Sequence, residues 1–349
     1  GHIGINVEEF EIANLEADIT LRDGVLAASD RLTNPAFLSA NIIGTYARSQ
    51  KALNIANLKI TMADGRDIAF VGRVDNIGTS SVSFAGGLKA DNLALRTILA
   101  DWPETVAVDY KALIESHING GFLQHGNAQI AGRYNPDNGA LALSRFDFDG
   151  HFSGLRVNVA NDQYRRAVGT VDGNFAVRMG GQGKIDGLDI TATVSDGSLL
   201  LAGWESSVLV PRANLQAQFT NNRMLTGGVT ADFGPSGKIS LSANSTINNN
   251  NAIQTSAMDI STDDFDAALF TALWPAPAAT VPRRWLSQHM SSGRIRDAKL
   301  SFRTSYDANI GRHQLQDIKG NWRLRDTTLG WSDHSPSFTN LNADLSIDN

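Results

Sequence analysis

The 349-residue sequence contains no cysteine. This absence excludes disulfides, thiol nucleophiles and zinc sites built on cysteine. It also fits a protein that works in an oxidising compartment, where free thiols are reactive. Proline is scarce, with nine residues. Because proline cannot donate a hydrogen bond to a β-ladder, the long proline-poor stretches are compatible with strands.

Long apolar runs and a strong excess of one charge are also missing. No run reaches the roughly 18–20 apolar residues that span a bilayer. The formal net charge is -6, which argues against a nucleic-acid partner. Since 42% of the residues are hydrophobic, the chain is too apolar to be disordered throughout. We therefore expect a folded protein without a nucleic-acid partner.

Alternation of apolar and polar residues with a period of two dominates the sequence. This period places successive side chains on opposite faces of a strand. It recurs at a spacing that predicts roughly fifteen to twenty strands and an antiparallel, mainly β architecture. The clearest examples are 15–21, 58–62, 155–159, 188–194, 215–219 and 341–347.

Turn-forming residues recur among these segments. Dipeptides of Asp or Asn followed by Gly favour tight turns. We expect turns at 23–24, 64–65, 137–139, 172–173, 196–197 and 234–237.

Two segments, 91–121 and 263–293, have helical spacing instead, and they match each other at a constant offset of 172 residues. In each, a Trp-Pro pair (Trp102-Pro103 and Trp274-Pro275) predicts a corner between two short helices, since proline disfavours helix at the preceding residue. This indicates an internal duplication. We predict a first β segment at 1–90, one repeat at 91–262 and a truncated second repeat at 263–349, all in one elongated domain.

The second copy carries a motif of moderate specificity. Trp274-Pro275, Trp285-Leu286 and the stretch 293–300 (Gly-Arg-Ile-Arg-Asp-Ala-Lys-Leu) resemble the pattern Trp-Pro … Trp-Leu … Gly-x-Ile-x-x-Ala-x-Leu of the AsmA-like superfamily, in its YhdP-type, TamB-related branch. The strand pairs around 57–65 and 196–215 are also similar. The first copy departs from the pattern, with Leu113 in place of Trp285.

The resemblance implies a fold and a function. Proteins of this family are bridge-like lipid transfer proteins of the bacterial envelope, with a long, curled, taco-shaped sheet whose open groove carries phospholipid acyl chains. The resemblance also implies that this chain is a periplasmic segment of a longer protein. That protein would be anchored in the inner membrane, would meet membranes at its ends and could have envelope proteins as partners. The alternative from another class is a structural or adhesive β-repeat protein without a lipid ligand.

We expect the groove to be lined by the clearest apolar strand positions. Trp102, Trp274 and Trp285 are expected to pack the helix pairs against the sheet or to gate the groove. The predicted groove residues are Leu58, Ile60, Phe70, Ile130, Leu143, Phe148, Val157, Ile190, Leu199, Leu201, Leu215, Phe219, Val229, Leu241, Leu300, Phe302 and Trp322.

No catalytic residue, cofactor or metal site is expected, and the chain is predicted not to be an enzyme. His117 and His289 occupy equivalent places but lack a ligand three or four residues on. A carbohydrate-acting enzyme would need convergent carboxylates, and Asp147 and Asp149 alternate with Phe, which points them to solvent. The pair at 263–264 is expected to cap a helix.

Overall fold

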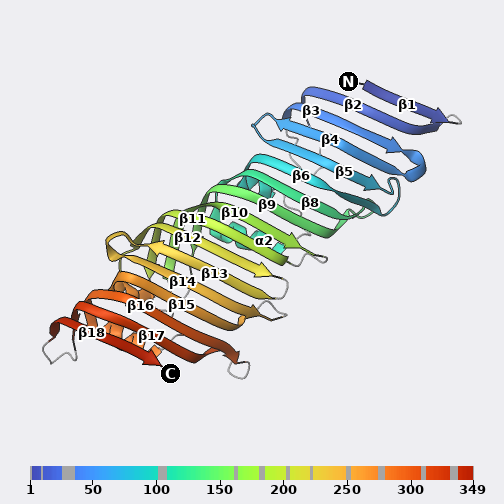
Figure 1. Cartoon of the computed structure of the whole chain (residues 1–349). Coiled ribbons are helices and arrows are strands. Elements are labelled where there is room, and N and C mark those ends of the chain that lie inside the picture. The colour runs from blue at the N-terminus through green and yellow to red at the C-terminus, as the bar shows by residue number, and fades with distance from the viewer. Residues whose placement is uncertain are drawn as a thin grey trace. The chain divides into compact units, whose positions relative to one another are not determined.

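The computed structural model confirms a mainly β protein, in which the described strands belong to one open antiparallel sheet of 18 strands (Figure 1). Two pairs of short helices interrupt the strands. The structure describes residues 2–8, 11–25, 36–100, 108–160, 164–180, 185–201, 205–220, 223–248, 253–273, 280–307, 312–330 and 337–348.

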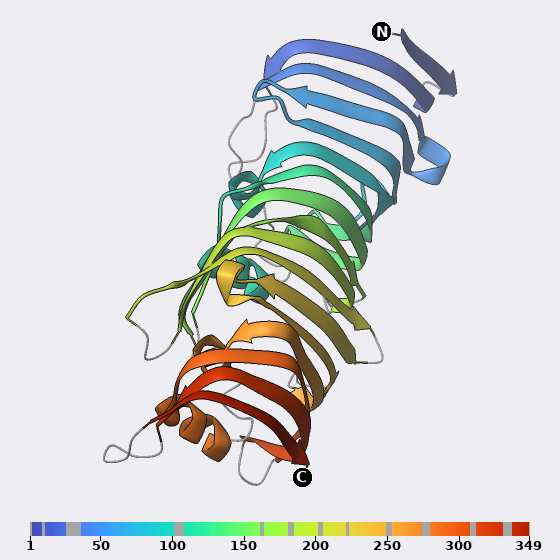
Figure 2. The same cartoon turned by 60° about the vertical axis from the view of Figure 1, so that its left-hand side comes forward.

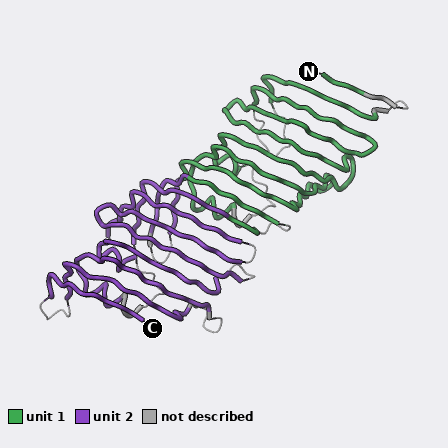
Figure 3. The backbone as a smooth tube through the Cα atoms, viewed as in Figure 1, with its two compact units in different colours: residues 1–155, 173–188 green, residues 156–172, 189–349 purple. Residues whose placement is uncertain are grey.

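The chain forms two compact units (Figure 3). Unit 1 contains residues 1–155 and 173–188, and unit 2 contains residues 156–172 and 189–349. Strand β10 (Tyr164–Met179) contributes to both units, as does β11 (Ile185–Leu201). The division into three segments that the sequence predicts stays a prediction.

Unit 1 is a meander in which successive strands pair antiparallel from β1 to β6, and β6 then pairs with β8 and β8 with β9. A 3₁₀ turn at Arg48–Gln50 joins β3 to β4. The bounds are β1 His2–Glu8, β2 Glu11–Val25, β3 Ala36–Ala47, β4 Ala52–Met62, β5 Asp67–Asp75, β6 Val82–Ala94, β7 Ile118–Asn119, β8 Phe122–Asn135 and β9 Ala140–Val159.

Unit 2 is also a meander, in which each strand from β12 to β18 pairs antiparallel with the next. Its strands are strongly curved, and its two helices lie on the inner side of the curve (Figure 2). The bounds are β12 Val208–Thr220, β13 Met224–Asp232, β14 Lys238–Ile247, β15 Ile253–Asp266, β16 Met290–Asp307, β17 Arg312–Leu329 and β18 Phe338–Asp348.

The helix pairs lie where the duplication predicts them. Helices α1 (Leu95–Ala100) and α2 (Val108–His117) follow β6, and helices α3 (Ala267–Leu273) and α4 (Thr280–His289) follow β15. The first residues of α1 and α3 are 172 positions apart, and so are both ends of α2 and α4. The Trp-Pro corners at 102–103 and 274–275 lie outside the described residues.

Three of the predicted turns are instead inside strands. The Asp-Gly pairs at 23–24, 172–173 and 196–197 lie within β2, β10 and β11. Asp23 and Asp196 both have a φ of 51°. Aspartate tolerates this left-handed conformation and can place a local irregularity within a strand without ending it. The pair at 64–65 does form a turn, between β4 and β5, where the Gly65 N–H donates to the Met62 carbonyl.

Candidate functional site

Directly opposed residues of antiparallel strands point to the same face of a sheet, so the register defines each face. In unit 1 this register joins apolar side chains into continuous rows. We call the face that carries them the apolar face. One row reads Ile19, Ile42, Leu58, Phe70, Leu88, Ala128 and Phe148 from β2 to β9.

Neighbouring rows on this face are also apolar or small. A second row crosses the same seven strands, and a third is separated from the first by a row of mixed size: Ala17, Gly44, Ile55, Gly72, Gly86, Ile130 and Phe146. The second reads Leu21, Ala40, Ile60, Ile68, Ala90, Gly126 and Gly150. The third reads Leu15, Tyr46, Leu53, Val74, Phe84, Gly132 and Leu143.

Unit 2 has an apolar face built in the same way. Its rows cross β12 to β17 or β18. One reads Leu215, Val229, Leu241, Ile260, Leu300, Gly320 and Ile347. Another reads Ala217, Gly227, Ala243, Met258, Phe302 and Ile318.

The opposite face of each unit is polar. In unit 1 one of its rows reads Thr20, Asn41, Lys59, Ala69, Lys89, Asn127 and Asp149. In unit 2 one reads Gln216, Gly228, Ser242, Asp259, Ser301, Lys319 and Asp348. Side chains pair across strands here, as Asn127 of β8 does by donating to Asp149 of β9 at 3.1 Å. They also pair along one strand, as Arg145 and Asp147 of β9 do at 2.5 Å.

Aromatic rings lie over the glycines of the apolar face. A Cβ added at Gly72 or at Gly86 would come within 2.6 Å of the Phe70 ring. The Phe148 ring covers Gly150 in the same manner, at 2.7 Å from such an atom. Because these glycines have no side chain, the rings can spread along the sheet and extend its apolar surface.

The burial of the apolar face differs between and within the units. In unit 1, Leu58, Ile60 and Phe70 are half-buried. A small buried cluster of Phe37, Ala40 and Met62 lies on this part of the sheet. Half-burial leaves part of each ring or branched side chain in contact with solvent.

In unit 2, α3 covers the apolar face over β15 and β16. Ala267, Leu269 and Phe270 of α3 are at most 4% exposed and join a core with the strand residues. Asp266 caps the helix by accepting a hydrogen bond from the Leu269 N–H at 2.8 Å. Toward β12 to β14 the same face is half-buried, at Leu215, Val229 and similar positions.

The predicted groove residues fall into two groups. Half-buried residues are Leu58, Ile60, Phe70, Ile130, Leu143, Phe148, Val157, Ile190, Leu199, Leu215, Phe219, Val229 and Leu241. Buried residues are Leu201, Leu300, Phe302 and Trp322, at 1–8% exposure. These four belong to the core of unit 2 and do not line an open surface in this conformation, because the chain's own packing covers them.

Further members of the rows, which the alternation alone does not single out, are Ile42, Leu53, Ile68 and Leu88. Their alternation is visible in the sequence, but only the strand register shows that they are level with the predicted residues. Trp285 lies in α4, is 36% exposed and contacts His289, with ring centroids 5.0 Å apart and ring planes tilted by 41°. Trp102 and Trp274 lie outside the described residues.

Other candidate residues have structural partners. His117 and His289 are the last residues of their helices. The pair at 263–264 lies inside β15 and does not cap α3; that role belongs to Asp266. Asp264 instead accepts a hydrogen bond from Arg294 at 2.8 Å and lies 3.8 Å from Arg296.

Within the described residues there is no group of three or more His, Asp or Glu side chains that could hold a metal ion. None of the helices in the described ranges is both long and apolar enough to cross a membrane. Comparison of the chain with protein-family models, curated proteins and solved structures found no match. The resemblance to the AsmA-like superfamily therefore stays a prediction from the quoted motif.

Proposed function

We propose that this chain is a periplasmic segment of a bridge-like lipid transfer protein, and that its apolar face carries phospholipid acyl chains between the inner and outer membranes. The observation that carries the proposal is an unbroken row of apolar side chains that crosses seven strands of unit 1. Every side chain in this row is half-buried or small. Soluble proteins normally bury such a surface or use it for binding.

The energetics of this surface suit transfer better than capture at one site. Each methylene removed from water gains about 0.8 kcal/mol. An acyl chain that lies along the rows therefore gains several kcal/mol, and the gain is similar from one strand to the next because the rows repeat the same side-chain types. The phosphate headgroup would remain in water, so the proposal requires no catalytic group.

The cover that α3 forms in unit 2 limits this surface. Between β12 and β14 the apolar face is half-buried, while at β15 and β16 Phe302, Leu300 and the helix fill the same space. An acyl chain and α3 therefore compete for the same side chains. The proposed lipid-accessible surface in this conformation includes the rows of unit 1. In unit 2 it includes the apolar face of β12 to β14.

Photo-crosslinking combined with native mass spectrometry tests the proposal. A photoreactive amino acid at Phe70 or Leu215 should crosslink to phospholipid in bacterial cells, and the purified chain should carry phospholipid without detergent. The same amino acid at Lys59 or Gln216, which are exposed on the polar face, is the matched control. Equal crosslinking from both faces, or lipid-free protein in repeated preparations, would support a structural β-repeat protein instead.

A further inference from the structure

The polar face of unit 2 carries two adjacent hollows, of about 660 and 490 Å³, over the neighbouring strands β11 to β15 (strands in Figure 1). Thr191, Gln216, Ser242 and Asp259 line both hollows, which therefore form one continuous trough across five strands. At a strand spacing of about 4.8 Å, this trough is about 19 Å long. We propose that it binds a neutral, hydroxyl-rich oligosaccharide that lies across the strands.

The side chains of the trough come from alternate positions of each strand, which share one face of the sheet. Those of β12 to β15 belong to the polar rows, as their register shows. Two hydrogen bonds place residues of β11 on the same face: Gln218 donates to Asp189 at 2.7 Å, and Thr193 donates to Asn214 at 3.3 Å. All lining residues belong to unit 2.

A glycine leaves space on the floor of the trough. Gly228 lies in one row between Gln216 and Ser242. A Cβ added at Gly228 would lie 3.4 Å from Gln216 Nε2, so the amide of Gln216 borders the space above the glycine. A ligand that enters this space therefore meets an amide group at its side and a hydroxyl group on the next strand.

Several side chains of the trough have hydrogen-bonding capacity that the protein does not use. Gln216, Ser242 and Asn244 are exposed, and their side chains form no hydrogen bond within the described part of the chain. An amide offers two donor hydrogens and an accepting oxygen, and a hydroxyl both donates and accepts. Each hydroxyl of a sugar also does both. This set of groups therefore complements neighbouring hydroxyls of sugar rings.

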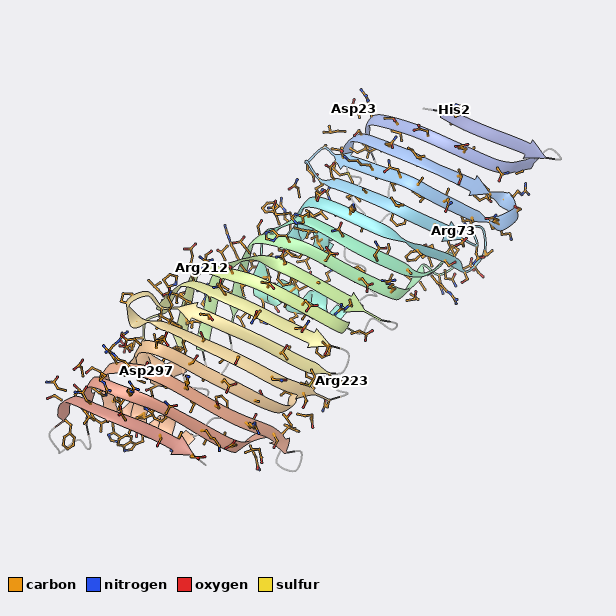
Figure 4. The ribbon with its side chains drawn as sticks, viewed as in Figure 1. His2, Asp23, Arg73, Arg212, Arg223 and Asp297 are labelled. Atoms are coloured by element: carbon orange, nitrogen blue, oxygen red, sulfur yellow. The ribbon has the colours of Figure 1, made fainter. Side chains whose placement is uncertain are left out.

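The lining argues against other classes of ligand. Among the described residues it contains carboxylates but no Lys, Arg or His, so it would repel an anion. Lys299 and Arg303 lie one strand beyond it, and Arg212 and Arg223 lie at opposite edges of the sheet (Figure 4). A peptide that adds as a strand needs a free strand edge, whereas β12 to β15 are paired on both sides.

Isothermal titration calorimetry of the full chain with maltohexaose, cellohexaose and hexa-N-acetylchitohexaose tests this site. We expect saturable binding of at least one of these neutral sugars. Gln216→Ala and Asn244→Ala should each weaken binding by about tenfold, because each removes hydrogen bonds to the sugar. Gly228→Val should abolish binding, since its side chain fills the floor but leaves every polar group in place. The φ of Gly228 is not positive, so valine fits this strand position.

Gln129→Ala on the polar face of unit 1 is the matched control. Gln129 is exposed and directly opposite a glycine, and a Cβ added at Gly87 would lie 3.0 Å from Gln129 Nε2. This variant should bind sugar as the parent protein does. A sulfated heparin hexasaccharide should not bind, because the carboxylates of the trough repel it. Circular dichroism establishes that each variant is folded.

Three results would overturn the proposal. They are the absence of binding for all three neutral sugars at millimolar concentration, unchanged binding in Gly228→Val, and tighter binding of the sulfated sugar than of the neutral ones. The trough lies on the face opposite the apolar rows, so the proposed lipid function is tested separately. Lipid crosslinking from Phe70 and Leu215 should be the same in Gly228→Val as in the parent protein.

Discussion

Two glycines at equivalent places in the duplication show how a single residue constrains the sheet. Gly121 and Gly293 both have positive φ, at 98° and 129°. A Cβ at Gly293 would lie 2.6 Å from Thr327 Cα, and one at Gly121 would lie 2.9 Å from Leu155 Cα. The partner residues are themselves 172 positions apart. Each glycine therefore allows the strand after the helix pair to pass close to the next strand.

We predict that Gly293→Ala lowers the free energy of unfolding by about 2–4 kcal/mol, because the new side chain meets backbone and adopts a strained φ. Gly65→Ala is the matched control. Its φ is 87°, but nothing lies within 4 Å of the added Cβ. This control should cost only about 1 kcal/mol. Urea denaturation measures both, and equal losses would contradict the steric explanation.

The pKa of Asp232 is lowered from its ordinary value of 3.8, first by the Gly234 N–H that donates to it and then by Lys238. The folded protein thus binds this proton less tightly than the unfolded chain. The carboxylate stabilises the fold above pH 3.8 and loses that effect as the pH falls through the lowered pKa.

We expect Asp232→Asn to be less stable than the parent protein near neutral pH, and the difference in free energy of unfolding to shrink as the pH falls below 3.8. Chemical denaturation over a pH series measures this. Asp18→Asn, an exposed residue of β2, serves as the control. A difference that stays constant down to the acid limit would contradict the role of the ionised carboxylate.

At the scale of elements, the two helix pairs share a position in the chain but differ in packing. In α3 four residues are buried, and Phe270 is 4% exposed. In α1 Leu95 is the only buried residue, and Ile98, which is equivalent to Phe270, is half-buried. The larger apolar side chains of the second copy therefore hold its first helix more firmly on the apolar face.

Truncation of the equivalent residues should show this difference. We expect Phe270→Ala to lower the free energy of unfolding by about 3–5 kcal/mol. Ile98→Ala should lower it by about 1–2 kcal/mol, because a half-buried side chain gains less from packing. Hydrogen exchange of the α3 amides should also accelerate in Phe270→Ala. Losses of the same size at both positions would mean that the two helices are anchored equally.

At the scale of the whole molecule, both units present rows of apolar and small side chains. If lipid occupies these rows, a charge in one unit should remove lipid only there. We predict that Phe70→Asp or Leu215→Asp lowers the number of phospholipids retained per chain, and that the double variant retains almost none. Native mass spectrometry counts them. Complete loss from either single variant would indicate one discrete site and contradict a distributed surface.

The sequence alone determined the fold class and the places of the helix pairs. Alternation with a period of two is imposed by strand geometry, and the match at 172 residues is preserved by identical and apolar positions such as Ile118/Met290. The alternation is visible within each short stretch of sequence, and the match at 172 residues is found by comparing two such stretches. They can therefore be read without knowing which strands are neighbours.

The tertiary structure alone decided which apolar residues are open and which are covered. In β4 a bulge between Ile55 and Leu58 reverses the alternation, so residues of odd and even number share the apolar face. Phe302 is buried in a core that residues of α3 also join, although α3 lies in another part of the sequence. Register and covering are set by long-range contacts, and a pattern of single residues carries no information about them.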